Sequence, residues 1–176
     1  DSSSTNLLGT ISVLDYCRRY DIPLVYASSS AIYGDLALGD DESEKIDLLS
    51  PYAVDKYVME IYAKAAFRLY GLSSIGLRFF NVYGPRSRTS GTYGAVFGVF
   101  LAQKLAGKPF TVVGDGEQTR DFTFVTDVVD ALIKAASSSN VGGVFNVGSG
   151  ATVSVNTLVN LLGGDVTYIP KRPGEP

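Results

Sequence analysis

Short apolar runs alternate with helical segments along this chain, and that alternation constrains the fold more than any other feature. Residues 24–27 are a short apolar run bounded by small polar residues, as buried parallel strands are, and residues 144–147 are expected to form another strand. Residues 6–20 carry apolar side chains at helical spacing, and Ser50-Pro51 opens a second helical segment that Gly71 ends. Strands alternating with helices favour a mostly parallel, doubly wound α/β sheet.

The other expected elements follow the same alternation. We expect strands at 74–81, 110–113, 119–125 and 166–169, and helices at 95–106, 126–137 and 154–162. Ligands of such sheets bind beyond the carboxyl ends of the strands. The serines at 28–30 and the residues at 79–83 fall at two of these ends. A ligand site is therefore expected there.

Composition excludes several kinds of function. The 176 residues carry a formal charge of −3, which is unlike the basic excess that meets nucleic acids or anionic membranes. No apolar run approaches the length of a membrane helix, and no signal peptide is visible. The single Cys17 cannot form an internal disulfide, so a cytoplasmic location is expected. Without histidine, Ser-His triads and histidine metal sites are excluded, and we expect no metal.

Tyr52 and Lys56 stand four residues apart in the expected second helix, so their side chains share one helix face. A nearby ammonium lowers the pKa of a phenol from about 10 by favouring the phenolate. Such a phenol could transfer protons near neutral pH. The alternative is an incidental pair on a solvated helix face, and the serines at 28–30 are equally compatible with a polar loop.

Several longer motifs surround this pair, and together they span most of the chain. They are VYASSSAIYGD at 25–35, SPYAVDK at 50–56, LRFFNVYGPR at 77–86, GDGEQTRDF at 114–122 and RPGE at 172–175. On these motifs the chain resembles the extended short-chain dehydrogenase/reductases, and within them the NAD-dependent nucleotide-sugar epimerase/dehydratase family.

The resemblance implies catalytic roles for Ser29, Tyr52 and Lys56. Tyr52 would take the proton of a sugar hydroxyl while hydride passes to NAD. Lys56 would hold the nicotinamide ribose and lower the pKa of the phenol, and Ser29 would hydrogen-bond the reacting oxygen. The expected cofactor contacts also include Ser28, Phe79 and Phe80, although both phenylalanines could simply be core residues.

The resemblance also implies a substrate site for a nucleotide-activated sugar, with a UDP-hexose expected as partner. Its expected residues are Asn81, Arg120 and Arg172 around the diphosphate, Thr111, Val112 and Val113 beside the base, Phe122 against the nucleotide, and Glu175 of the RPGE motif. Guanidinium groups suit phosphate binding. The alternatives are a surface position for Arg172 and an apolar strand position for Phe122.

Within the family, the residues favour a 4-epimerase of the UDP-glucose/galactose type. Dehydratases of this family place an Asp-Glu pair where this chain has Ser30 and Ala31, so no acid is evident there for expelling water. A dehydratase stays open as the alternative within the family. Outside catalysis, the alternatives are a nucleotide-sugar-binding remnant and a self-associating remnant.

The expected fold is α/β, a partial Rossmann-type doubly wound parallel sheet with a small interleaved α/β substrate-binding region. Residues 1–84 and 119–148 would form the back half of the NAD-binding domain, and residues 85–118 and 149–176 the nucleotide-sugar region. The family's glycine-rich phosphate turn is absent from this chain, which is expected to be a carboxyl-terminal part of the enzyme. An uncovered sheet edge would favour a homo-oligomer, including a domain-swapped one.

Overall fold

The structure is a computed structural model that describes residues 3–36, 45–87, 89, 96–139 and 142–170. It divides into two compact units. The first contains Asp1–Phe79 and Val129–Val147, and the second contains Phe80–Val128 and Gly148–Glu175. Each unit is described by itself.

A parallel three-stranded sheet forms the centre of the first unit. Its strands are β1 (Leu24–Ser29), β2 (Ser74–Phe79) and β6 (Gly142–Val147), in the order β1-β2-β6. The register aligns Ser28 with Arg78 and Arg78 with Asn146. The carboxyl ends of these strands therefore lie at one edge of the sheet.

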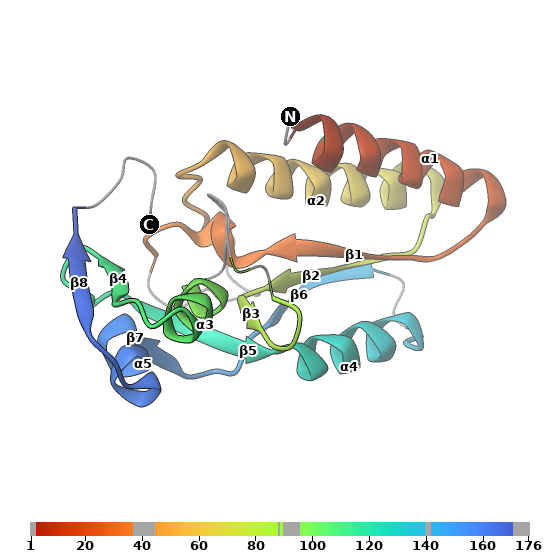
Figure 1. The fold of residues 1–176 in the computed structure, drawn as a ribbon. Helices are drawn as coiled ribbons and strands as arrows, with labels where there is room; N and C mark the ends of the chain where they lie inside the picture. The colour runs from red at the N-terminus through yellow and green to blue at the C-terminus, as the bar shows by residue number, and fades with distance from the viewer. Residues whose placement is uncertain (1–2, 37–44, 88, 90–95, 140–141, 171–176) are drawn as a thin grey trace. The chain divides into compact units, whose positions relative to one another are not determined.

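Helices lie on both faces of this sheet. The long helices α1 (Gly9–Tyr20) and α2 (Pro51–Tyr70) run side by side on one face, and the residues of α4 (Val125–Ala136) that belong to this unit lie on the other (Figure 1). A π-helical turn, η1 (Ser4–Leu8), precedes α1, and a 3₁₀ turn, η2 (Ser30–Tyr33), follows β1. The arrangement is the expected doubly wound one.

The local sequence explains where α2 begins and ends. The Ser50 hydroxyl accepts a hydrogen bond from the Ala53 amide, and Pro51 occupies the first helical position. Gly71 ends the helix at φ +70°, a left-handed conformation that glycine adopts without a steric penalty. Tyr52 therefore lies in the first turn of a helix with a well-defined start.

The core of the first unit fills the space between its two long helices and β1. Its buried residues are Leu14, Cys17, Tyr26, Met59, Ala63 and Leu72. Burial of apolar surface contributes about 25 cal/mol per Å². This contact holds α2 against the sheet.

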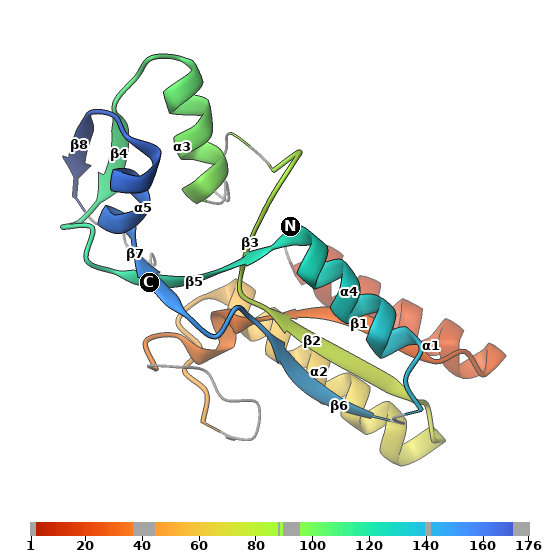
Figure 2. The same cartoon turned by 90° about the horizontal axis from the view of Figure 1, so that it is seen from below.

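A three-stranded sheet and a two-stranded sheet, together with helices, form the described part of the second unit (Figure 2). Strand β3 (Asn81–Tyr83) pairs in parallel with β5 (Thr119–Phe124), and β5 pairs antiparallel with β7 (Thr152–Ser154). Strand β4 (Phe110–Val113) pairs in parallel with β8 (Val166–Ile169). Helices α3 (Val96–Leu105) and α5 (Val155–Leu162) pack on a buried cluster of Phe100, Phe110, Val112, Val155, Leu158 and Val159.

The structure confirms the α/β fold class and corrects three details. The strand expected at 74–81 is two strands, because β2 pairs with β1 and β6 whereas β3 pairs with β5. The turn η2 was not expected; the Ser29 hydroxyl starts it by accepting a hydrogen bond from the Ala31 amide. The short strand β7 was also missed. Within the described residues, no helix is both long and apolar enough to span a membrane.

Candidate functional site

Tyr52 and Lys56 lie on one face of α2, as their spacing predicts. The Lys56 ammonium is 5.8 Å from the centroid of the Tyr52 ring and donates a 2.9 Å hydrogen bond to the carbonyl oxygen of Ala27 in β1. The Tyr52 side chain is 39% exposed, so its phenol is open to a ligand. Lys56 thus connects the candidate base to the end of β1.

The electrostatics of Lys56 suit a functional ammonium. Burial lowers the pKa of Lys56 below its ordinary value of 10.5, and the negative charge of the adjacent Asp55 partly opposes this shift. This side chain lies over the Tyr52 ring, whose face attracts a cation.

The two serines at the end of β1 have different partners. Ser28 is buried and donates a 2.5 Å hydrogen bond to Glu60 Oε1. Ser29 accepts a 3.1 Å hydrogen bond from the Ala31 amide, so its own hydroxyl hydrogen can be directed elsewhere. This suits Ser29 for contact with a reacting oxygen, whereas the hydrogen of Ser28 is already used. A cofactor contact of Ser28 stays a prediction.

Phe79 and Phe80 occupy the junction between β2 and β3. Phe79 is in register with Ser29 in the neighbouring strand, so it lies at the carboxyl edge of the sheet next to the candidate catalytic serine. Phe80 begins the second unit, and its ring lies close to Gly148, because a Cβ added there would be 3.3 Å from Phe80 Cδ2. Their contact with a nicotinamide stays a prediction.

The second unit brings together three of the expected substrate residues on β3 and β5. Asn81 is in register with Phe122, and its side-chain amide donates a 3.1 Å hydrogen bond to the Asp121 carbonyl. Arg120 precedes Asp121 and donates to the Thr119 carbonyl at 2.9 Å. Phe122 belongs to an aromatic group, with ring centroids 6.5 Å from Tyr83 and 6.4 Å from Phe97.

Asp121 was not expected in the site, yet it organises the chain around these residues. Its buried carboxylate accepts hydrogen bonds from the amides of Ser149 and Gly150, at 2.8 and 2.9 Å. A Cβ at Gly148 would lie 2.8 Å from Asp121 Oδ2, so the close approach requires glycine there. The carboxylate thereby holds the 148–150 turn beside β5.

The strand expected beside the base offers only part of its surface to a ligand. Val112 is fully buried in the core of the second unit, so its side chain could not reach a base without unpacking. Thr111 exchanges two hydrogen bonds with Gln103, at 2.8 and 3.1 Å, and the Val113 carbonyl accepts one from Gln118. Any base contact would therefore use the backbone or the partly exposed Thr111 and Val113.

The expected residues divide between the two units. Ser28, Ser29, Tyr52, Lys56 and Phe79 belong to the first; Phe80, Asn81, Thr111, Val112, Val113, Arg120 and Phe122 belong to the second. Arg172 and Glu175 lie outside the described residues. In the described part of the chain, no three Cys, Asp or Glu side chains come together as a metal site would require.

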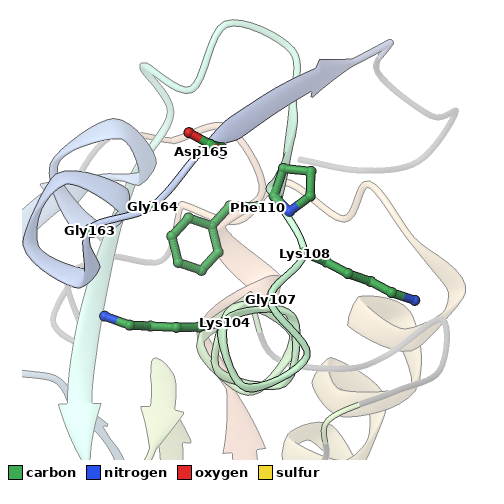
Figure 3. Close-up of a pocket in the computed structure, with 8 residues that line it drawn as sticks. Lys104, Gly107, Lys108, Phe110, Gly163, Gly164 and Asp165 are labelled. Atoms are coloured by element: carbon green, nitrogen blue, oxygen red, sulfur yellow. The ribbon is translucent and has the colours of Figure 1, made fainter.

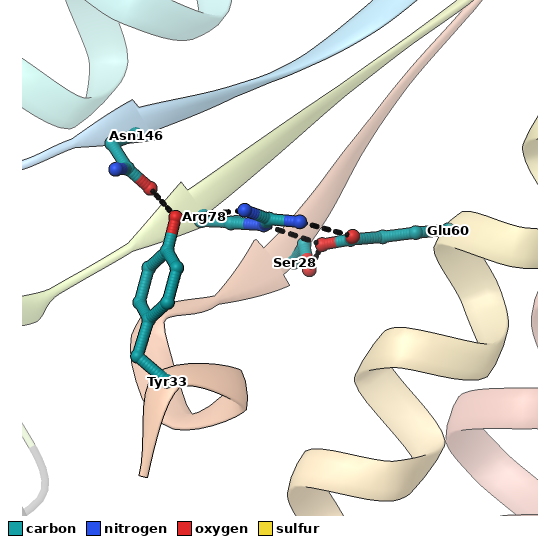
Figure 4. A network of polar contacts seen from close by, with 5 residues as sticks. All are labelled: Ser28, Tyr33, Glu60, Arg78 and Asn146. Atoms are coloured by element: carbon teal, nitrogen blue, oxygen red, sulfur yellow. Dashed lines mark hydrogen bonds and ion pairs between the residues drawn. The ribbon is translucent and has the colours of Figure 1, made fainter. Parts of the chain in front are cut away.

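The sequence interpretation missed a buried polar network directly behind the candidate catalytic residues. Glu60 of α2 pairs with Arg78 of β2, and hydrogen bonds extend from this pair to Ser28 and Tyr33 (Figure 4). One signal could have revealed it: Arg78 stands within the otherwise uncharged strand SIGLRF, and a buried guanidinium requires a partner.

A separate hollow of about 200 Å³ lies in the second unit, between the carboxyl ends of α3 and α5 and the starts of β4 and β8 (Figure 3). Lys104 and Lys108 border it together with Phe110 and Asp165. Lys104 donates a hydrogen bond to the carbonyl of Leu162, the last residue of α5. This lysine caps the helix. None of the expected site residues lines the hollow.

Comparison with known proteins places these observations in a family. The model of the NAD dependent epimerase/dehydratase family matches residues 1–148. A Methanocaldococcus jannaschii protein described as a candidate UDP-glucose 4-epimerase is 41% identical over 97% of this chain and 58% of its own length.

Solved structures agree with this match. The UDP-N-acetylglucosamine 4-epimerase of Methanobrevibacter ruminantium, in complex with UDP-N-acetylmuramic acid, has a TM-score of 0.89 and 35% identity. The match covers 98% of this chain and 58% of that structure's chain. The UDP-glucose 4-epimerase of Thermus thermophilus, in complex with NAD, has a TM-score of 0.86 and 34% identity, with 97% of this chain covering 58% of it. This chain therefore spans about 58% of the length of these relatives, and it belongs to the NAD dependent epimerase/dehydratase family.

Proposed function

We propose that the whole protein is an NAD-dependent 4-epimerase of a nucleotide-activated hexose, of the UDP-glucose/galactose type. The observation that carries this proposal is the position of Lys56, between the Ala27 carbonyl at the end of β1 and the Tyr52 ring on α2. A phenol that is open to a ligand, with a cation beside it and Ser29 at the adjoining strand end, suits proton transfer from a sugar hydroxyl.

The roles proposed for the residues agree with this geometry. Tyr52 accepts the proton of the sugar hydroxyl at C4. The positive charge of Lys56 lies beside the ring of this tyrosine. Ser29 donates a hydrogen bond to the reacting oxygen. Bound NAD would supply the hydride acceptor and, for the second half of the reaction, the hydride donor. We propose these residues as neighbours of the nicotinamide end of NAD, together with Ser28, Phe79 and Phe80.

The substrate side of the proposal rests on β3 and β5. Asn81 and Arg120 would bind the diphosphate, Phe122 would lie against the nucleotide, and residues 111–113 would flank the base, with Arg172 and Glu175 completing the set. Arg120 suits an anionic group because a guanidinium can donate two hydrogen bonds to one phosphate. Residues 1–84 and 119–148 are proposed as NAD-binding, and the remainder as nucleotide-sugar-binding.

Ser30 and Ala31 disfavour the dehydratase alternative. They form the first turn of η2, directly after Ser29, and neither carries a carboxyl group. Elimination of water needs an acid near the leaving hydroxyl. Simple oxidation and re-reduction needs none.

The whole protein would act in the cytoplasm as a homo-oligomer. Support for self-association comes from α1 and α2, which expose large apolar side chains, including Tyr16, Tyr20, Ile61 and Leu69. Exposed large apolar side chains of this kind are often found at protein interfaces.

The decisive experiment is conversion of UDP-glucose to UDP-galactose by the whole protein, measured for the wild type and for Tyr52→Phe. Proton transfer by a positioned side chain contributes about 10²–10⁴-fold to rate, so Y52F should lower kcat by about that factor. Tyr70→Phe, in the last turn of the same helix, is the control and should retain wild-type kcat. Binding of UDP without turnover would instead favour the non-catalytic alternative.

A further inference from the structure

The polar network of the first unit crosses its whole sheet in one row. Ser28, Arg78 and Asn146 are in register on β1, β2 and β6. Arg78 donates two hydrogen bonds to the Glu60 carboxylate, at 2.9 and 2.7 Å, and a third to the Tyr33 hydroxyl at 2.7 Å. Tyr33 in turn donates to Asn146 at 2.8 Å, and Figure 4 shows these contacts joining α2, η2 and the strands of the sheet.

The ion pair at the centre of this network is isolated from solvent. Arg78 is 7% and Glu60 is 6% exposed. Burial disfavours the charged guanidinium, but its hydrogen bonds to Glu60 and Tyr33 outweigh burial and raise the pKa of Arg78. Each hydrogen bond of this pair has an ionised or hydroxyl partner, so the two charges are well compensated.

Stability alone is a weak reason to retain such a pair. Buried ion pairs can often be replaced by apolar side chains of similar volume without loss of stability, whereas their fixed geometry can specify a particular arrangement of elements. A bidentate arginine–carboxylate contact allows little sliding or rotation of one element against the other. The network is therefore suited to fixing positions.

The positions that it fixes are those of the candidate catalytic residues. Glu60 is one helical turn after Lys56, which is one turn after Tyr52, on the same face of α2. Ser28 directly precedes Ser29, and Tyr33 ends the η2 turn that the Ser29 hydroxyl starts. Each catalytic candidate therefore has a network residue nearby on its own element.

We infer that Glu60 and Arg78 are positioning residues for the epimerisation, an inference that rests on the proposed function. By accepting a hydrogen bond from Ser28, Glu60 fixes the position of α2 along β1. This also fixes the position of the Lys56 ammonium between Ala27 and Tyr52. Arg78 extends the same constraint to η2 through Tyr33. Neither residue contacts the reacting atoms.

The test compares wild-type whole protein with Glu60→Gln and the double variant E60M/R78M. A misplacement of about 1 Å in an active site can lower the rate about 10²-fold. We expect kcat to fall about 10- to 100-fold in both variants, with KM within about 3-fold, because the proposed diphosphate contacts belong to the other unit. The double variant leaves no lone buried charge, so it stays testable where E60Q fails to fold.

The pH profile separates positioning from simple destabilisation. If Lys56 moves out of its buried position beside Ala27, burial lowers its pKa less, and the alkaline limb of kcat should shift to higher pH. Loss of folded protein would reduce kcat at every pH without moving that limb. Asp15→Asn, which breaks an exposed ion pair with Arg18 on α1, is the matched control and should change neither kcat nor the limb.

The outcomes distinguish the two proposals. An active wild type with a folded E60M/R78M variant of unchanged kcat and pH profile would overturn the positioning role alone. A wild type that converts no nucleotide sugar would overturn the proposed function and the positioning role together. A lower kcat with a shifted alkaline limb, in a variant that melts well above the assay temperature, would establish the role.

Discussion

At the scale of single residues, Lys56 is a candidate catalytic side chain whose pKa the fold changes. Burial lowers its pKa, so it loses its charge at a lower pH than an exposed lysine would. Between the lowered pKa and the ordinary value of 10.5, the unfolded chain binds more protons than the folded one. The contribution of Lys56 to the free energy of unfolding therefore rises with pH in this window.

Activity should fall as the pH rises, because Lys56 loses its charge. We expect the kcat of the whole protein to fall on the alkaline side with a midpoint below 10.5, where the ammonium is lost. Lys56→Arg keeps a cation throughout this range. The pH profile of its remaining activity should therefore not show this alkaline decrease. The measurement is a pH series of initial rates from about 6 to about 11 in both proteins. An identical alkaline limb in K56R would show that another group causes it.

Asp121 is the residue to test in the second unit. Asp121→Ala removes the charged acceptor of the Ser149 and Gly150 amides, and a hydrogen bond to a charged group contributes about 1.5–3 kcal/mol to stability. The free energy of unfolding should drop by about that amount in a urea titration. Asp115→Ala is the matched control, because Asp115 is exposed and its carboxylate accepts from the Glu117 amide alone among the described contacts. Equal losses for the two variants would contradict a special role for Asp121.

At the scale of elements, the start of α2 connects stability with catalysis. Ser50 caps this helix directly before Pro51 and Tyr52, and Ser154 caps α5 in the same way through the Thr157 amide. Loss of an N-cap hydroxyl costs about 1 kcal/mol. Ser50→Ala and Ser154→Ala should therefore lower the free energy of unfolding to a similar extent.

Only the first of these two caps should affect turnover. Fraying of the first turn of α2 moves Tyr52, whereas fraying of α5 moves no proposed catalytic residue. We expect kcat of the whole protein to decrease in Ser50→Ala and to stay near the wild-type value in Ser154→Ala. Equal turnover in both variants would show that Tyr52 does not depend on the cap.

The elements also show what the sequence could and could not predict. The helices at 51–70 and 155–162 were predicted correctly because Ser50-Pro51, Gly71 and Ser154 are local signals. The division of residues 74–83 into β2 and β3 depends on pairing with β1 and β5, which are distant in sequence. Local signals cannot report such pairing.

The same distinction holds for the site. The spacing of Tyr52 and Lys56 predicts a shared helix face, and the structure confirms it. Glu60 looks like one more charged residue on a helix until Arg78 and Ser28 are placed opposite it. Val112 looks like a strand residue available to a base, but the packing of α3 and α5 buries it. Long-range packing decides these cases.

At the scale of the whole molecule, the remaining prediction concerns the exposed apolar side chains of α1 and α2. Leu69 is 71% exposed, and Val13, Tyr16, Tyr20 and Ile61 are also exposed on these helices. Neighbouring apolar side chains on two adjacent helices would be shielded from water by a second copy of the same face in a symmetric dimer.

A charge on this face should prevent the dimer. We expect the whole protein to elute as a dimer in size-exclusion chromatography with light scattering, and Val13→Arg/Ile61→Arg to elute as a monomer, because each arginine would face its counterpart or an apolar surface across the two-fold axis. Ile133→Arg is the control: Ile133 is similarly exposed but lies on α4, on the opposite face of the sheet (Figure 1), and should leave the dimer intact. Dissociation by Ile133→Arg together with a dimeric Val13→Arg/Ile61→Arg variant would place the interface on α4 instead.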